Sequence, residues 1–290
     1  MNDENTTLLK PISPYPALLL IKDSEKHLVI ADLHLGWEAS LAERGVHIPL
    51  QANKLLKRIE RIISAEKPDC LIILGDVKHT VEKIELEEWR NVPAFFESLL
   101  KKISCIKVVP GNHDGNIEAL LPEGVELESQ KEIIIGDIGL FHGHAWPDIR
   151  ILSCKTLVIG HIHPVISLRD PMGFRITSQV WVRAPCNPET LAKSMLKRYN
   201  IRVKANEDVK AVVKSNFSIE VKVKNLLIMP SFNDFLGGRA VNRTSPFGEA
   251  AFKDFIGPIL RSRSINLREA EVYLLDGTFI GLLKQLIMPK

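Results

Sequence analysis

The chain has 290 residues, of which 45% are hydrophobic and 25% are charged. This length suits one large domain or a domain with a smaller appendage, and this composition is that of a globular protein with a full core. A disordered chain, a collagen-like chain and a disulfide-held miniprotein are excluded. The longest apolar runs are too short to span a bilayer, and the N-terminus is acidic where a signal peptide is basic. We therefore expect a cytoplasmic protein with no membrane partner.

The formal net charge of +3 averages two unlike halves. Residues 1–163 hold 18 Lys and Arg against 24 Asp and Glu, a net charge of −6. Residues 164–290 hold 20 against 11, a net charge of +9. All nine histidines lie at or before His163. Because histidine is the commonest metal ligand among side chains, the first half is where we expect a metal site.

The cysteines show neither a C-x-x-C pair nor the spacing of a zinc site. Three of them open apolar runs, where a small buried thiol packs well. We expect all four to be free, in a reducing compartment, at Cys70, Cys105, Cys154 and Cys186.

Apolar periodicity predicts strands that alternate with helices in the first part of the chain. The expected elements are a hairpin over 17–22 and 27–31, a helix over 50–65, a strand over 70–74, a helix over 84–102 that is broken or kinked near Pro93, and a strand over 106–109. Further on we expect short strands over 132–141 and 157–159, a basic helix over 188–199, a strand over 219–228, and a hairpin over 271–275 and 279–283.

This order of elements predicts an α/β sandwich with mixed sheets. The composition changes near residue 183, where basic residues become frequent. We expect a catalytic domain over 1–182 and a smaller basic C-terminal region over 183–290 that extends the same fold and contributes to substrate binding.

Five polar motifs each follow an apolar strand directly. Ligand sites in α/β sheets gather beyond the carboxyl ends of the strands, so these side chains are expected to meet in one crevice. Each motif alone is commonly a turn or a satisfied histidine, but together they predict a polar site. The motifs are Asp32-Leu33-His34, Gly75-Asp76, Gly111-Asn112-His113-Asp114, His142-Gly143-His144 and Gly160-His161-Ile162-His163.

The series D-x-H, GD, GNHD, HG and GHxH, over residues 27 to 182, resembles the calcineurin-like metallophosphoesterase superfamily. The fuller motifs Asp32–Gly36, Gly75–His79 and Gly160–Pro164, with Met229–Phe232 and Gly237-Gly238, are similar to its ICC-like phosphoesterase branch, which includes bacterial ligase-associated DNA damage response endonucleases. The resemblance implies a four-layer α/β/β/α fold and a dinuclear enzyme. Such an enzyme hydrolyses phosphodiesters by in-line attack of a metal-bridging hydroxide.

Two cations held close together need an anionic ligand between them to offset their repulsion, and Asp76 is the candidate for it. The first cation is expected to bind Asp32, His34 and His163, and the second Asn112, His142 and His161. Mixed imidazole and oxygen ligands suit Mn²⁺, Fe, Zn²⁺ or Ni²⁺ better than Ca²⁺ or Mg²⁺. The family resemblance favours Mn²⁺.

The resemblance makes His113 the catalytic histidine, which donates a proton to the leaving oxygen or stabilises the transition-state charge. Asp114 orients that imidazole or, at the same spacing, caps a helix beginning near Asn116. His142 is favoured over His144 as the metal ligand because it is nearer the strand and matches the His-Gly pattern. His144 then contacts substrate or supports a ligand.

Lys78 and His79 follow Asp76 closely enough to face the phosphate, or they lie in an exposed loop. The basic stretch Lys193–Lys204, with Arg239, Arg243, Arg261 and Arg263 further on, either follows a phosphate backbone or forms a solvated face. Tryptophans near the motifs either stack on a base or belong to the core: Trp37, Trp146 and Trp181.

The expected substrate is a phosphodiester, and the basic second half favours DNA or RNA. One alternative is a phosphodiesterase acting on a small nucleotide. Another is a non-catalytic scaffold with the same fold, which the filled ligand positions disfavour. The sequence leaves open the oligomeric state, the resident metal, and endo- against exonucleolytic cleavage.

Overall fold

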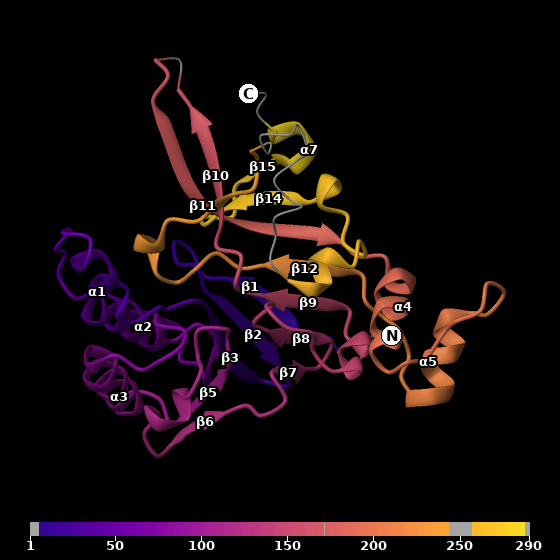
Figure 1. Cartoon of the computed structure of the whole chain (residues 1–290), viewed down its shortest axis with the longest axis horizontal. Coiled ribbons are helices and arrows are strands. Elements are labelled where there is room, and N and C mark those ends of the chain that lie inside the picture. Colours follow the sequence, from indigo (N-terminus) through magenta and orange to yellow (C-terminus); the bar gives the residue numbers. More distant parts are fainter. Residues whose placement is uncertain (1–5, 171, 244–256, 288–290) are drawn as a thin grey trace.

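The computed structural model describes residues 6–170, 172–243 and 257–287 (Figure 1). The acidic N-terminus, on which the expected cytoplasmic location partly rests, lies outside these ranges. Among the described residues, no helix has the length and apolar character needed to span a membrane. The α-helices are α1 (Trp37–Ala42), α2 (Ala52–Glu66), α3 (Leu86–Leu100), α4 (Pro188–Arg198), α5 (Val209–Phe217), α6 (Pro258–Arg261) and α7 (Leu283–Leu286).

The first sheet has six strands in the order β1-β2-β3-β4-β5-β6. The pairs β3–β4, β4–β5 and β5–β6 are parallel, whereas β1–β2 and β2–β3 are antiparallel. Their bounds are β1 (Leu8–Pro11), β2 (Leu18–Lys22), β3 (Glu25–Ile30), β4 (Cys70–Leu74), β5 (Cys105–Val109) and β6 (Val125–Leu127). The parallel pairs place the polar ends of β3, β4 and β5 at one edge.

The second sheet has nine strands, and its central path is β13-β10-β11-β12-β9-β8-β7. Strand β14 also pairs with β11, and β15 pairs with β14. The β10–β11 hairpin projects from the body of the molecule (Figure 1). The strands are β7 (Glu132–Ile135), β8 (Ile138–Phe141), β9 (Thr156–Ile159), β10 (Pro164–Arg169), β11 (Arg175–Pro185), β12 (Asn225–Ile228), β13 (Arg239–Ala240), β14 (Glu271–Leu274) and β15 (Phe279–Leu282).

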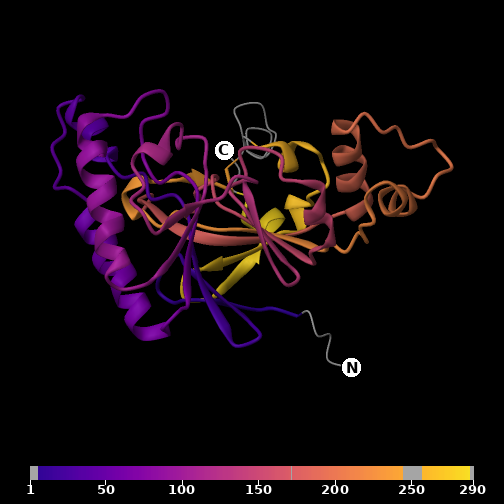
Figure 2. The same ribbon diagram turned by 90° about the horizontal axis from the view of Figure 1, so that it is seen from below.

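The two mixed sheets pack face to face between two layers of helices, as expected. Apolar residues such as Leu20 and Ile72 of the first sheet meet Leu140 and Val158 of the second. One outer core lies under α2 and α3, and the other lies under α4 and α5. Figure 2 shows these helix pairs on opposite flanks of the molecule. Apolar surface is buried between the two sheets and under each pair of helices. This burial fixes the position of one sheet edge relative to the other.

Residues after 182 form several strands of the second sheet. Strand β11 (Arg175–Pro185) runs across the expected domain boundary, and β12 lies between β11 and β9. The expected strand over 219–228 is shorter, because only Asn225–Ile228 pairs with neighbouring strands. Val221 and Val223 are buried in the alternating pattern of a strand, but their segment hydrogen-bonds to the loop before β9 instead. The helix over 84–102 continues through Pro93 as α3.

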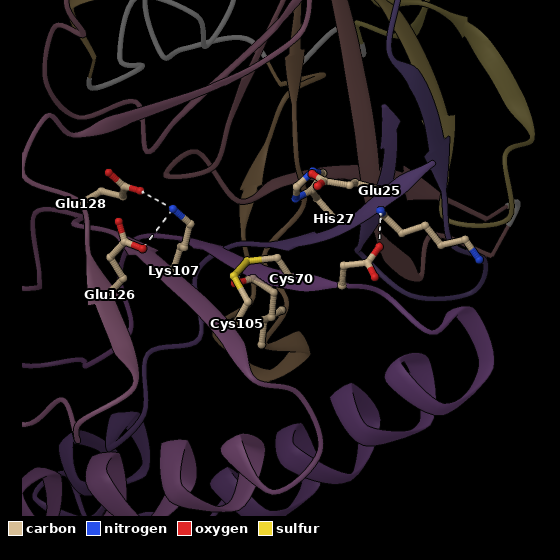
Figure 3. Close-up of a disulfide and its surroundings, with 10 residues drawn as sticks. Glu25, His27, Cys70, Cys105, Lys107, Glu126 and Glu128 are labelled. Carbon is tan, nitrogen blue, oxygen red and sulfur yellow. Dashed lines mark hydrogen bonds and ion pairs between the residues drawn. A yellow bond between two sulfur atoms is a disulfide. The ribbon is translucent and has the colours of Figure 1, made fainter. Parts of the chain in front are cut away.

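The prediction of four free cysteines is wrong for one pair. Cys70 and Cys105 form a disulfide between the first residues of β4 and β5, which are direct partners in the parallel register (Figure 3). Lys107, two residues along β5, is paired with Glu126 at 3.0 Å. Cys154 and Cys186 are free and buried, as expected. The sequence signal for the pair was available, since both cysteines open consecutive buried strands. The inferred reducing compartment loses this part of its support.

Candidate metal centre

The five polar motifs meet at the carboxyl ends of strands from both sheets. In each of two groups that share Asp76, the ligand atoms lie within 4.8 Å of one another. The first group joins Asp32, His34, Asp76 and His163, and the second joins Asp76, His142 and His161. His34 also forms a cluster of this kind with His79 and His113. The structure thus brings together all the expected Asp and His ligands in the two expected sets.

Asp76 belongs to both groups and sits between them. Its Oδ2 atom lies 3.4 Å from Nε2 of His34 and 3.4 Å from Nε2 of His142. Its other oxygen, Oδ1, accepts a hydrogen bond of 3.0 Å from the backbone N–H of His113. Burial opposes ionisation of Asp76, but the imidazoles of His142 and His34 outweigh it and lower its pKa. One carboxylate oxygen therefore faces both groups, as a bridging ligand must.

Several ring nitrogens at the centre are buried without a hydrogen-bond partner among the described residues. They include Nε2 of His34, His161 and His163. Burial lowers the pKa of His34, and burial with the charge of His142 lowers that of His161 to about 4. At His163, burial is outweighed by the carboxylate of Asp32, which raises the pKa. Neutral imidazoles with free lone pairs are the form that binds metal. A buried polar atom left unpaired is costly, so these nitrogens fit divalent cations.

His142 is oriented by its other ring nitrogen. Nδ1 donates a hydrogen bond of 2.7 Å to the carbonyl of Leu74, which leaves Nε2 directed at Asp76. Burial opposes a charge on His142, but Asp76 and Asp32 raise its pKa to about 9. A backbone carbonyl behind a histidine ligand is the usual arrangement at metal sites. His142 is in the second group of ligand atoms and His144 is not, in agreement with the preference for His142.

The backbone is strained at the predicted ligands. Five of them have positive φ: Asp32 (59°), His34 (44°), Asp76 (52°), His161 (66°) and His163 (47°). The left-handed region costs a residue with a side chain roughly 1–2 kcal/mol. Such strain persists where the surroundings fix the backbone, and it clusters at functional sites. The strand ends are therefore shaped to direct side chains inward.

Glycines precede two of these ligands because the chains approach closely. A Cβ atom at Gly75 would lie 2.5 Å from Nδ1 of His142. One at Gly160 would lie 2.8 Å from Oδ2 of Asp32. Both distances are shorter than a carbon atom tolerates, so the Gly-Asp and Gly-His motifs are required by packing around the ligands.

His113 and His79 lie beside the first group of ligand atoms. The ring of His113 is 4.6 Å from that of His34, and Nδ1 of His79 is 3.3 Å from Nδ1 of His34. Nδ1 of His113 also contacts the carbonyl oxygen of His79. Burial and the neighbouring imidazoles lower the pKa of His79 to about 4. Both predicted residues are therefore at the centre, and His79 packs against a ligand.

Both interpretations of Asp114 are wrong. Its carboxylate accepts hydrogen bonds from the backbone of Val77 (2.9 Å), Lys78 (3.3 Å) and Gly111 (2.8 Å). The short 3₁₀ helix that follows has Asn116 at its N-cap, with no side-chain cap. Asp114 therefore neither orients His113 through a hydrogen bond nor caps a helix. It ties the loop after β5 to the loop after β4.

The expectation that Lys78 faces the phosphate is also wrong. Its side chain is fully buried, and its ammonium group donates to the carbonyl oxygen of Thr80. His144 is half-buried, and its ring lies 5.2 Å from that of His142. Asn112 is exposed at the same loop as His113 and remains a predicted ligand.

A C-terminal segment that the sequence analysis treated only as a family marker supports the first ligand loop. The backbone N–H of Phe232 donates to Ala31 at 2.7 Å, and Nδ2 of Asn233 donates to Leu33 at 2.9 Å. Phe232 and Asn233 are buried. These bonds hold the backbone on both sides of Asp32. The buried amide of Asn233 had no recognisable signal, because its partner is far away in the sequence.

Two hollows flank the centre. A basic hollow of about 550 Å³ is lined by His144, Trp146, Ser194, Lys197, Gly257, Pro258, Arg261 and Ser262. An acidic hollow of about 310 Å³ lies beside His79 and His113, and its lining includes Glu43, Glu85, Glu87 and Glu88. The basic hollow therefore adjoins the second ligand group through His144, and the acidic hollow adjoins the first through His79 and His113.

Comparison with known proteins agrees with this arrangement. A family model for calcineurin-like phosphoesterases matches residues 26–201. The solved nuclease MPE of Pseudomonas putida is similar over 93% of this chain and 97% of its own, with a TM-score of 0.51 and 16% sequence identity. The phosphoesterase Yfce of E. coli matches 50% of this chain and 73% of its own, with a TM-score of 0.32 and 18% identity. No curated protein matches this sequence. The similarity to the nuclease supports the two-sheet fold.

Proposed function

Because the chain belongs to the calcineurin-like phosphoesterase family, we propose that it hydrolyses phosphodiester bonds with two divalent cations bound at the candidate metal centre. The observation that carries this proposal is the position of Asp76. One of its carboxylate oxygens lies 3.4 Å from an imidazole nitrogen of each ligand group. A single oxygen shared between two imidazole-rich groups suits a dinuclear site better than a structural ion pair.

We assign Asp32, His34 and His163 to the first cation, and Asn112, His142 and His161 to the second, with Asp76 shared. When bound, the two cations supply Lewis acidity and lower the pKa of water. The ligand set suits Mn²⁺, and also Fe, Zn²⁺ or Ni²⁺.

The leaving group departs with the help of His113. Since Nδ1 of its ring is held by the carbonyl of His79, Nε2 is the nitrogen left for the substrate. In its protonated form, His113 donates from Nε2 to the leaving oxygen or stabilises the charge developing there. His79 keeps the ring in place.

The proposed substrate is a nucleic acid, DNA or RNA. Support comes from the net charge of +9 on residues 164–290 and from the basic hollow beside His144. The fold shared with a Pseudomonas putida nuclease agrees with this proposal. A panel of single-stranded DNA, RNA and small nucleotide diesters tests it against a small-molecule phosphodiesterase.

The test of the core proposal is hydrolysis of bis-p-nitrophenyl phosphate by the metal-depleted protein after addition of Mn²⁺. We expect turnover that needs the metal. Asp76→Asn should lose more activity than the roughly 10–100-fold that removal of a residue supporting a metal ligand costs. Asp23→Asn is the matched control, because Asp23 is exposed and pairs with the neighbouring Lys22. Absence of metal-dependent turnover, or equal activity in Asp76→Asn, refutes the proposal.

A further inference from the structure

We propose that the basic hollow is a nucleotide subsite, in which Lys197 and Arg261 bind a phosphate next to the scissile one. Phosphates of the substrate then continue from the metal centre on the His144 side only. This inference rests on the proposed function, because it names the substrate's position at the same centre.

The first support is the place of the hollow. His144 lines it, and the ring of His144 lies 5.2 Å from that of His142 and 6.2 Å from that of His161. A group in the hollow is therefore next to the second set of predicted ligands. Its volume of about 550 Å³ is in the range of sites for small molecules and single nucleotides.

The second support is its charge. Lys197 is exposed on α4 and Arg261 is exposed at the end of α6, and the lining residues that the structure describes include no carboxylate. Neither cation forms an ion pair with any residue in ranges 6–170, 172–243 and 257–287. Two such cations facing one hollow attract an anion of comparable size. Arginine is especially suited to phosphate because its guanidinium donates two parallel hydrogen bonds.

The third support is an apolar wall for the rest of a nucleotide. Trp146 lines the hollow and packs on the core of the second sheet. The guanidinium of Arg198 lies 5.8 Å from the centre of its ring and donates to the carbonyl of Pro147. The contacts with Arg198 and with the core help to fix the indole. A fixed aromatic ring is a common surface for a base or sugar in proteins that bind single strands.

The acidic hollow determines on which side of the metal centre the further phosphates of the substrate lie. Four glutamates line it beside His113, and Glu88 uses its carboxylate to accept backbone N–H groups of His79 and Thr80. Like charges repel a phosphate in a partly enclosed hollow. The leaving group near His113 is therefore one that carries no further phosphate, and the charged remainder of the substrate lies toward Lys197 and Arg261.

The experiment uses the full-length protein with Mn²⁺ and three dinucleotides: one without a terminal phosphate, one phosphorylated at its 5′ end and one at its 3′ end. One phosphorylated form, not both, should have a higher kcat/KM than the unmodified dinucleotide. The double variant Lys197→Gln/Arg261→Gln should reduce this advantage by roughly tenfold. Lys57→Gln is the matched control, since Lys57 is exposed on α2 and is not among the residues that line the hollow.

Binding of a labelled single-stranded oligonucleotide to the metal-free protein gives a second readout. The double variant should lower the slope of log affinity against log salt by about 1 for each phosphate that the protein no longer neutralises. Equal preference for both termini, or an advantage and a salt slope that survive in the double variant, overturns the subsite. If no phosphodiester is hydrolysed but the variant still weakens binding, the proposed function fails while the subsite stands.

Discussion

The two sheets bring different chemistry to one centre. The first sheet supplies both carboxylates, Asp32 and Asp76, with His34, whereas the second supplies only imidazoles. Neither ligand group is complete within one sheet: His163 completes the first, and Asp76 is needed by the second. A site divided in this way exists only when the sheets are packed together. We therefore expect metal binding to require the packed pair of sheets, and removal of the metal with a chelator to lower the stability of the protein.

Further histidines lie beside the two ligand groups, His79 and His113 at the first sheet and His144 at the second. We expect His113→Ala to lower kcat by about 10²–10⁴-fold, because it removes the proposed general acid. His144→Ala should have a smaller effect, seen mainly in KM. Steady-state kinetics with Mn²⁺ and a dinucleotide, whose leaving alkoxide needs a proton, measure both, and metal analysis verifies that each variant retains its cations. Equal losses of kcat would contradict the assignment.

Predicted ligands at the strand ends of both sheets have a strained backbone. Pairs of glycine and alanine variants measure this strain. Asp32 and His163 have φ of 59° and 47°, so glycine relieves strain that alanine keeps. In the metal-free protein, Asp32→Gly and His163→Gly should each be more stable than the alanine variant by about 1 kcal/mol in urea unfolding. Thr177 is the control, because it lies in extended β11, where glycine should be less stable than alanine. If glycine is less stable than alanine at all three positions, the ligand loops are unstrained.

The smallest expected effect concerns the thiols. Cys70 and Cys105 of the first sheet are bonded, whereas burial raises the pKa of Cys154 and Cys186 beside the second sheet to about 11. At pH 8 roughly one such thiol in a thousand is ionised, and the thiolate is the reactive form. Thiol titration should therefore find almost none in the native protein, two after unfolding, and four after unfolding with reduction. Four without reduction would show that the disulfide is absent.

Sequence periodicity located the strands that carry the ligands, because a buried parallel strand is a short apolar run that ends at its polar motif. The histidines and aspartates were found for the same reason. The hydrogen bonds of Asp114 were not predictable, since they depend on which loop lies across from its own. The burial of Lys78 was not predictable either, since it depends on how the rest of the chain packs around its loop. The helix over Val209–Phe217 was missed because it is short and three of its apolar residues are valines, which favour strands.

The buried segment at Phe232 and Asn233 has a consequence for synthesis. A chain emerges from the ribosome in sequence order, and its N-terminal parts fold first. All predicted ligands have been made once His163 has emerged, but the bonds that hold Ala31 and Leu33 need residues that come much later. Strand β12, which adjoins the strand ending before His161, is also late. The centre therefore matures only on a nearly finished chain, so the nascent polypeptide exposes its histidines well before it has a competent site for a cation.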